Sequence, residues 1–151
     1  MRIKFFFLSV VFLNVFADIG HKIILQNIII KNYDGFELII LMAFINALII
    51  LPFILLFTPS GFLSDRYLKN RIIQYGAGIA FVIASLMSIS YCHGLFNVAL
   101  VLLFLLAIQS AVYSPAKFSY VLHLYGKENL SLGNALVQSL SIIAILASMS
   151  I

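Results

Sequence analysis

The chain has 151 residues, of which 64% are hydrophobic and 9% charged, and its mean hydropathy is +1.15. Water-soluble domains are about 45–50% apolar and about 25% charged, so this composition excludes a soluble globular domain. It also excludes a disordered chain, and a disulfide scaffold because Cys92 is the only cysteine. The net charge of +4 does not indicate nucleic-acid binding, because the placement of the charges matters here more than their sum.

Five apolar segments of helical length follow one another along the chain. A segment that crosses lipid must satisfy its own backbone hydrogen bonds, and these runs lack the alternating polarity of a transmembrane β-barrel. We therefore predict an all-α, polytopic membrane protein with about five transmembrane helices and no room for a large soluble catalytic domain. The predicted spans lie near 5–30, 38–57, 72–91, 95–118 and 134–151.

The positive charges of the linkers predict the orientation. Seven Lys/Arg residues belong to one side of the predicted topology and only Lys31 to the other, which places the N-terminus in the cytoplasm. An alternative is a cleaved signal peptide that ends at Ala17, but the apolar run that resumes at Ile23 favours an uncleaved first span. The seven cations are Arg2, Lys4, Arg66, Lys69, Arg71, Lys117 and Lys127.

Polar residues of the first span gather on one side of its predicted helix. At 3.6 residues per turn they fall within an arc of about 140°. A charge at mid-bilayer costs several kcal/mol unless it is paired or hydrated. Asp18 and Lys22 are four residues apart, so they form either a neutralised packing pair or part of a stripe along a substrate or ion pathway. We favour the pathway because the stripe is longer than the pair; it consists of Asn14, Asp18, His21, Lys22 and Gln26. No metal site is expected, because His21 has no ligand partner at suitable spacing.

The second linker carries a dense group of charges. It reads Gly61-Phe62-Leu63-Ser64-Asp65-Arg66-Tyr67-Leu68-Lys69-Asn70-Arg71. This resembles the signature G-x-x-x-D-R-x-x-[RK]-x-[RK] between the second and third helices of major facilitator superfamily transporters, with Leu68 in place of the usual glycine. The resemblance implies a conformational-switch loop on the cytoplasmic side, formed by Gly61, Asp65, Arg66, Lys69 and Arg71. Gly61 is expected to allow a tight helix exit, and Asp65 to accept hydrogen bonds from arginine. The alternative is a plain basic loop.

Motifs in three spans resemble bacterial lysophospholipid transporters, and equally the membrane module of fused acyltransferase/acyl-ACP synthetase proteins. The first, Phe16-Ala17-Asp18-Ile19-Gly20-His21-Lys22, is similar to their F-x-D-N-x-x-K segment. The others are Tyr113-Ser114-Pro115-Ala116-Lys117-Phe118 and Asn134-Ala135-Leu136-Val137-Gln138. The resemblance covers essentially the whole chain and implies transport roles for Asp18 and Lys117. Two positions depart from it: Ile19 replaces Asn, and Gln138 replaces a Glu. Gln138 cannot titrate, but it can hydrogen-bond a headgroup or a neighbouring helix, so we keep it among the expected pathway residues.

Several residues are expected to shape the helices. Small residues recur every fourth position at Gly76, Ala80, Ala84 and Ser88, which indicates close helix packing. Pro115 is expected to break the end of the fourth helix near Lys117, and Pro52 to kink the second. Tyr113, Phe118 and Tyr120 resemble an interfacial aromatic belt, so Lys117 either snorkels to the headgroups or lines the pathway.

Taken together, these patterns predict the N-terminal part of a major facilitator transporter that moves lysophospholipids, or another amphiphile, across a bacterial inner membrane. Such folds have six-helix halves built from three-plus-three repeats, so a sixth helix and a second half are expected to be missing. The alternatives are the membrane module of a bifunctional acyltransferase and a small scaffold without transport activity. No catalytic motif, cofactor or nucleic-acid partner is expected; the expected partners are the bilayer, the amphiphile, and the missing half or a fused acyltransferase.

Overall fold

The computed structural model describes residues 2–150, and each of the five predicted spans is a helix in it. The helices are α1 (Arg2–Asn32), α2 (Gly35–Arg66), α3 (Lys69–Cys92), α4 (Phe96–Tyr125) and α5 (Leu130–Ser148), and the described residues form no strand. The predicted all-α class is therefore confirmed. The fifth helix begins at Leu130 rather than Asn134 and ends at Ser148, and Ile151 lies outside the described residues.

All five helices are long and apolar enough to cross a bilayer. The longest, α2, has 32 residues. At 1.5 Å per residue it spans about 48 Å, more than the hydrocarbon core of about 30 Å. Large apolar side chains cover the outside of the bundle, and Phe36, Phe57 and Phe81 are 75%, 79% and 75% exposed. Soluble monomers rarely show extended apolar surfaces of this kind, whereas lipid solvates them. The chain is a multi-pass membrane protein.

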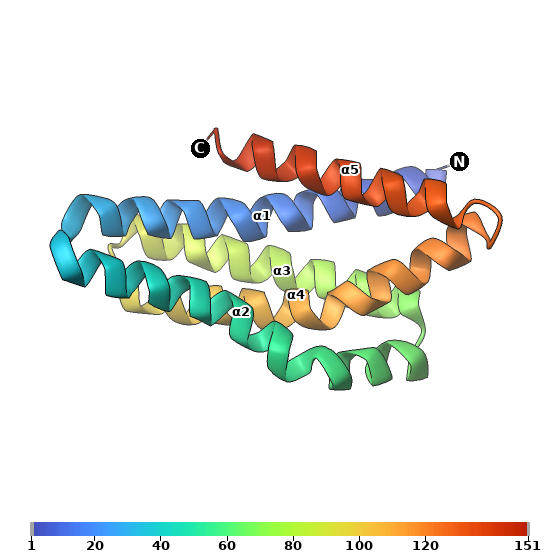
Figure 1. The fold of residues 1–151 in the computed structure, drawn as a ribbon, viewed down its shortest axis with the longest axis horizontal. Coiled ribbons are helices and arrows are strands. Elements are labelled where there is room, and N and C mark those ends of the chain that lie inside the picture. The colour runs from blue at the N-terminus through green and yellow to red at the C-terminus, as the bar shows by residue number, and fades with distance from the viewer. Residues whose placement is uncertain (1, 151) are drawn as a thin grey trace.

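The central helix of the bundle is α4. It packs along α2 and α3 and also contacts α1 and α5, while α5 lies along α1 (Figure 1). Two apolar clusters divide the interior, one around Leu103 and Leu106 of α4 and the other around Tyr113 and Val121 of the same helix. The turns of α4 between Leu106 and Tyr113 therefore lie between the two clusters, and this is where polar side chains meet.

The linker cations gather at one end of the bundle. The start of α1, the α2–α3 connection and the α4–α5 connection lie at that end, and the other two connections lie opposite (Figure 1). This arrangement agrees with the predicted alternation of the spans, and the cytoplasmic assignment of the basic end stays a prediction. The cations at this end are Arg2, Lys4, Arg66, Lys69, Arg71 and Lys127.

The prediction that Gly61 allows a helix exit is wrong. The helix α2 continues through Gly61 to Arg66, and the chain turns at Tyr67 and Leu68, whose backbones are extended. A glycine inside a helix costs only about 1 kcal/mol relative to alanine, which is too little to end a long apolar helix by itself. The turns that do use a left-handed glycine are elsewhere, for example at Gly94 and Gly126, with φ of 65° and 73°.

The prediction that Pro115 breaks the fourth helix is also wrong. Pro115 lies inside α4, which continues to Tyr125, and Pro52 lies inside α2. A proline within a helix removes one backbone donor, so the carbonyl of Ala111 loses its helical partner. Both helices change direction along their length (Figure 1), which is the response expected of an internal proline.

The stripe of small residues on α3 packs over only part of its length. Gly76 approaches α4 so closely that an added Cβ would lie 3.2 Å from the Gln109 amide nitrogen and 3.3 Å from Tyr113 Cδ2. Ala80 is buried, whereas Ser88 is exposed. A four-residue spacing drifts by about 40° per step around a helix of 3.6 residues per turn, so the stripe rotates away from α4. The predicted packing role holds for Gly76 and Ala80 and is wrong for Ser88.

Candidate functional site

Four polar side chains meet between α1 and α4 at the centre of the bundle. Ser110 donates a hydrogen bond to Asp18 Oδ2, and the amide of Asn14 lies 3.4 Å from that oxygen and 3.3 Å from Ser110 Oγ. The Gln109 amide lies 3.4 Å from Asn14 Oδ1. We call Asn14, Asp18, Gln109 and Ser110 the polar core. Its members come from only two helices, because α1 and α4 each place two polar residues on the face that meets the other.

The second carboxylate oxygen of Asp18 is unusual for a membrane interior. Asp18 Oδ1 is buried and has no hydrogen-bond partner among the described residues. A buried polar atom without a partner costs free energy, and an ionisable group at membrane depth costs more. Side chains in such positions are by default candidates for substrate, ion or proton sites. Asp18 is therefore the residue around which the site is built.

The predicted pairing of Asp18 with Lys22 does not occur. The hydrogen-bond partners of the Asp18 carboxylate are Ser110 of α4 and Asn14, which lies one turn earlier in α1. Lys22 is half-buried one turn further along α1 and makes no hydrogen bond or ion pair with Asp18. The neutralised packing pair is thus not what holds Asp18 in the membrane.

Lys117 lies on α4, the helix that supplies Gln109 and Ser110 to the polar core. It is half-buried on α4, two turns beyond Ser110, and its ammonium nitrogen lies 4.9 Å from the ring centroid of Phe118. Because α4 continues to Tyr125, Lys117 is not at a helix end. Tyr113 lies between Ser110 and Lys117 along α4, is 3% exposed, and its buried hydroxyl has no partner among the described residues. Tyr113 therefore does not belong to an interfacial belt.

His21 is held away from the polar core by α3. Its Nδ1 lies 3.2 Å from the Tyr91 hydroxyl, which also lies 3.4 Å from the His21 carbonyl oxygen. This contact joins the second half of α1 to the end of α3 that faces away from the basic end. The predicted stripe thus divides: Asn14 and Asp18 enter the polar core, and His21 makes a separate interhelical contact.

The remaining predicted site residues lie outside the polar core. Gln138 is exposed on α5. Asp65 is exposed in the last turn of α2 and accepts no hydrogen bond from an arginine within the described part of the chain, so that expectation is wrong. A carboxylate in the last helical turn faces the negative end of the helix dipole, which favours exposure to water. Arg66 and Arg71 are exposed as well, and Lys69 is half-buried.

Sequence reasoning missed the α4 half of the polar core. Gln109 and Ser110 form the only adjacent pair of strongly polar residues inside the apolar run 95–112. The criterion that singled out Asp18, polarity within a span, would also have found them. Tyr113 carried no such signal, because a tyrosine near a proline and a lysine is typical of a membrane interface.

Comparisons with known proteins add no relative. No family model, curated protein or solved structure matches this chain. The functional reading therefore depends on the residues themselves and on the motif resemblance.

A recess beside the polar core completes the site. It has a volume of about 390 Å³, lies between α1 and α3, and reaches Asn14. Apart from Asn14, every residue that lines it is apolar: Val10, Leu13, Phe16, Ala17, Ala77, Ala80, Phe81 and Ala84. The bundle thus places an apolar recess directly against a polar group of the core.

Proposed function

We propose that this chain is a membrane transport module of the major facilitator type, located in a bacterial inner membrane with its basic end in the cytoplasm. Its cargo is an amphiphile, specifically a lysophospholipid. The observation that carries the proposal is the buried Asp18 carboxylate, held by Ser110 and Asn14 with one oxygen left unpartnered. Such a group is costly in a membrane and is retained where a substrate or ion supplies the missing partner.

The chemistry of the site supports an amphiphile. A lysophospholipid has one acyl chain and one polar headgroup, so its path needs polar groups on one side and apolar surface on the other. The polar core offers the first, and the recess that joins it at Asn14 offers the second. The Asp18 carboxylate suits a cationic headgroup such as ethanolamine, and the Lys117 ammonium suits the phosphate.

The motif resemblance supports the same cargo. Asp18 and Lys117 occupy the matching positions of the lysophospholipid transporter motifs, and both belong to the region that the bundle builds around α1 and α4. Gln138, at which the family has a carboxylate, is exposed on α5. The proposal therefore assigns coupling or headgroup contact to Asp18 rather than to position 138.

Photolabelling tests the proposal on the chain itself. Membranes that contain the protein are exposed to a photoactivatable lysophosphatidylethanolamine, and the labelled peptides are identified. We expect saturable labelling of α1 and α4 that unlabelled lysophosphatidylethanolamine displaces, and strongly reduced labelling in Asp18→Asn. Glu37→Gln is the matched control, because Glu37 is an exposed carboxylate at the opposite end of the bundle from the basic linkers. Labelling that is unsaturable, or that Asp18→Asn leaves unchanged, would contradict the proposal.

A further inference from the structure

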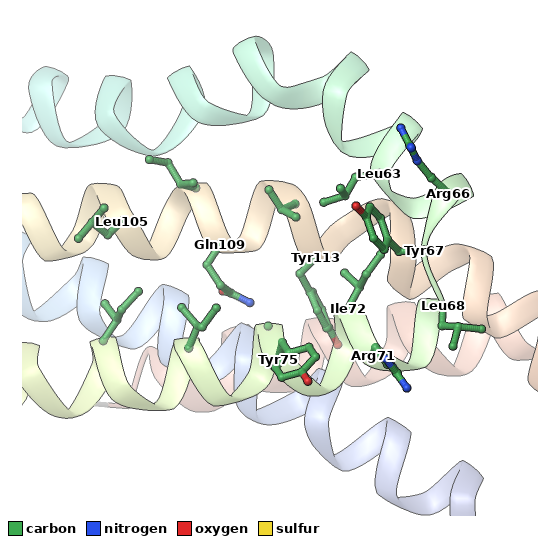
Figure 2. A pocket seen from close by; sticks show the side chains of 15 residues that line it. Leu63, Arg66, Tyr67, Leu68, Arg71, Ile72, Tyr75, Leu105, Gln109 and Tyr113 are labelled. Atoms are coloured by element: carbon green, nitrogen blue, oxygen red, sulfur yellow. The ribbon is translucent and has the colours of Figure 1, made fainter.

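A large groove opens on the side of the bundle away from α1 and α5. It has a volume of about 930 Å³ and lies between the last turn of α2, the part of α3 from Arg71 to Ile83, and α4. Figure 2 shows Leu105 and Gln109 along its α4 wall, and Arg66 and Arg71 at one end. Most of its lining is aliphatic, including Ile72, Ile79 and Ile83. A groove of this composition fits a hydrocarbon chain.

A second, polar cavity adjoins the groove at its basic end. It has a volume of about 460 Å³ and shares Tyr67, Leu68 and Arg71 with the groove. Its other lining residues are polar or aromatic: Lys69, Asn70, Gln74, Tyr120 and His123. The two cavities together form one site with an apolar body and a hydrogen-bonding, cationic head.

The charge of this composite site has one sign. Arg66, Arg71 and Lys69 line it, and no Asp or Glu does. Asp65, the carboxylate nearest to these cations in the sequence, lines neither cavity. Guanidinium groups bind phosphate oxygens in a fork geometry, so the head of the site suits a phosphate.

The length of the groove matches one leaflet of a bilayer. Arg71 directly precedes the apolar run of α3, and twelve residues separate it from Ile83 at the far end of the lining. At 1.5 Å per residue this is about 18 Å, and half of a hydrocarbon core of about 30 Å is about 15 Å. A lipid with its phosphate at Arg71 would therefore lay its acyl chain along the groove at its normal depth.

The groove shares one residue, Gln109, with the polar core. Gln109 lines the groove but directs its amide to Asn14 on the other side, and Gly76 packs against Gln109 and Tyr113. Asn14, Asp18 and Ser110 do not line the groove, so an occupant of the groove meets the polar core at Gln109 alone.

We propose that the groove and its polar head bind one anionic phospholipid of the surrounding leaflet, with the phosphate at Lys69 and Arg71, the two cations that line the polar head, and an acyl chain along Ile72, Ile79 and Ile83. The lipid joins α2 to α3, two helices that contact each other little and are held mainly through α4. This inference needs only insertion of the chain in a membrane. It stands or falls independently of lysophospholipid transport.

Native mass spectrometry of the full chain, extracted from defined bilayers, tests the proposal. Bilayers of phosphatidylcholine with phosphatidylglycerol are compared with phosphatidylcholine alone, and bound lipid is counted per protein. We expect one retained phosphatidylglycerol on the wild type. Each cation near a charged lipid is worth about fivefold in binding, so Lys69→Gln with Arg71→Gln should reduce retention by roughly 25-fold. Ile79→Trp, which fills the groove without changing charge, should also abolish retention.

Two controls distinguish a built site from general attraction. Arg2→Gln with Lys127→Gln removes the same charge from the same end of the bundle, and Ile142→Trp adds the same ring to the exposed face of α5. Both controls should retain the lipid as the wild type does, with helix content unchanged in every variant. Equal loss in both charge variants, equal retention of phosphatidylcholine, or no effect of Ile79→Trp would overturn the proposal. Displacement of phosphatidylglycerol by lysophosphatidylethanolamine would overturn it too, because the groove would then be a cargo site.

Discussion

Asp18 and Ser110 are 92 positions apart in the sequence, and their side chains share a hydrogen bond at the centre of the bundle. This bond joins α1 to α4 in the region between the two apolar clusters. It satisfies one oxygen of the carboxylate and leaves the other buried without a partner. The polar core thus links two helices and also leaves one carboxylate oxygen without a hydrogen-bond partner. Each of these two properties leads to a different prediction.

The hydrogen bond between Ser110 and Asp18 predicts that Ser110→Ala destabilises the bundle. Removing the hydroxyl leaves the Asp18 carboxylate with Asn14 as its remaining donor, a loss of about 1.5–3 kcal/mol for a bond to a charged group. The control is Ser85→Ala, because Ser85 is exposed and bonds only to the Phe81 carbonyl of its own helix. Thermal unfolding in detergent should show a lower midpoint for Ser110→Ala alone. Equal midpoints for the two variants would show that the bond contributes nothing.

The surroundings of two helical glycines, Gly133 at the contact between α4 and α5 and Gly78 on α3, predict different effects of substitution by alanine. A Cβ at Gly133 would lie 2.6 Å from Val121 Cγ1 and 2.9 Å from Tyr125 Cδ2, so Gly133→Ala should cost about 1–3 kcal/mol by overpacking. Gly78 is helical and has nothing within 4 Å of its added Cβ, so Gly78→Ala should be neutral or stabilising. The same unfolding assay compares them. A Gly133→Ala variant as stable as Gly78→Ala would contradict the close approach of α5.

The placement of Lys117 predicts a graded response to substitution. Lys117→Ala should impair lysophosphatidylethanolamine uptake because the phosphate loses its cation, and Lys117→Arg should retain part of the activity because the charge remains. Lys127→Ala is the control, since Lys127 is exposed in the α4–α5 connection. Uptake should fall in the order wild type, Lys117→Arg, Lys117→Ala. If Lys117→Ala and Lys127→Ala behave alike, Lys117 acts only as a surface charge.

The gathering of cations at one end predicts the topology. Cysteines at Asn70 and Asn32, in a background without Cys92, lie in connections at opposite ends of the bundle. A membrane-impermeant thiol reagent should label them from opposite sides of intact vesicles, with Asn70 on the cytoplasmic side. Labelling of both from one side would rule out the five-span arrangement.

The fold was accessible from the sequence because its signals are local. Span length and continuous apolarity are properties of consecutive residues, and they predicted five helices in the correct order. The errors came at helix ends. Gly61 and Pro115 were interpreted as terminators, but a helix end depends on what packs against the last turns, and α2 and α4 continue well past both residues.

Only the α1 half of the polar core could be predicted from the sequence. The periodicity of the first span placed Asn14 and Asp18 on one face, and the structure brings them together. Their partners could not be deduced from α1, because which face of α4 meets that face is decided by tertiary packing. Lys22 shows the same limit: its spacing from Asp18 permits an ion pair, but the nearby donors of Ser110 and Asn14 bind the carboxylate instead.

The central claim is that the polar core forms part of the path of a lysophospholipid. The most direct measurement is uptake of labelled lysophosphatidylethanolamine by vesicles containing wild-type protein or Asp18→Asn, which keeps the size of the side chain and removes its charge. The account predicts that Asp18→Asn loses most of the uptake while its abundance in the membrane and its thermal midpoint stay at or above those of the wild type. Normal uptake by Asp18→Asn would contradict it, and would make the polar core a packing device alone. Loss of the protein from the membrane would contradict it as well, because the carboxylate would then serve the fold rather than the cargo.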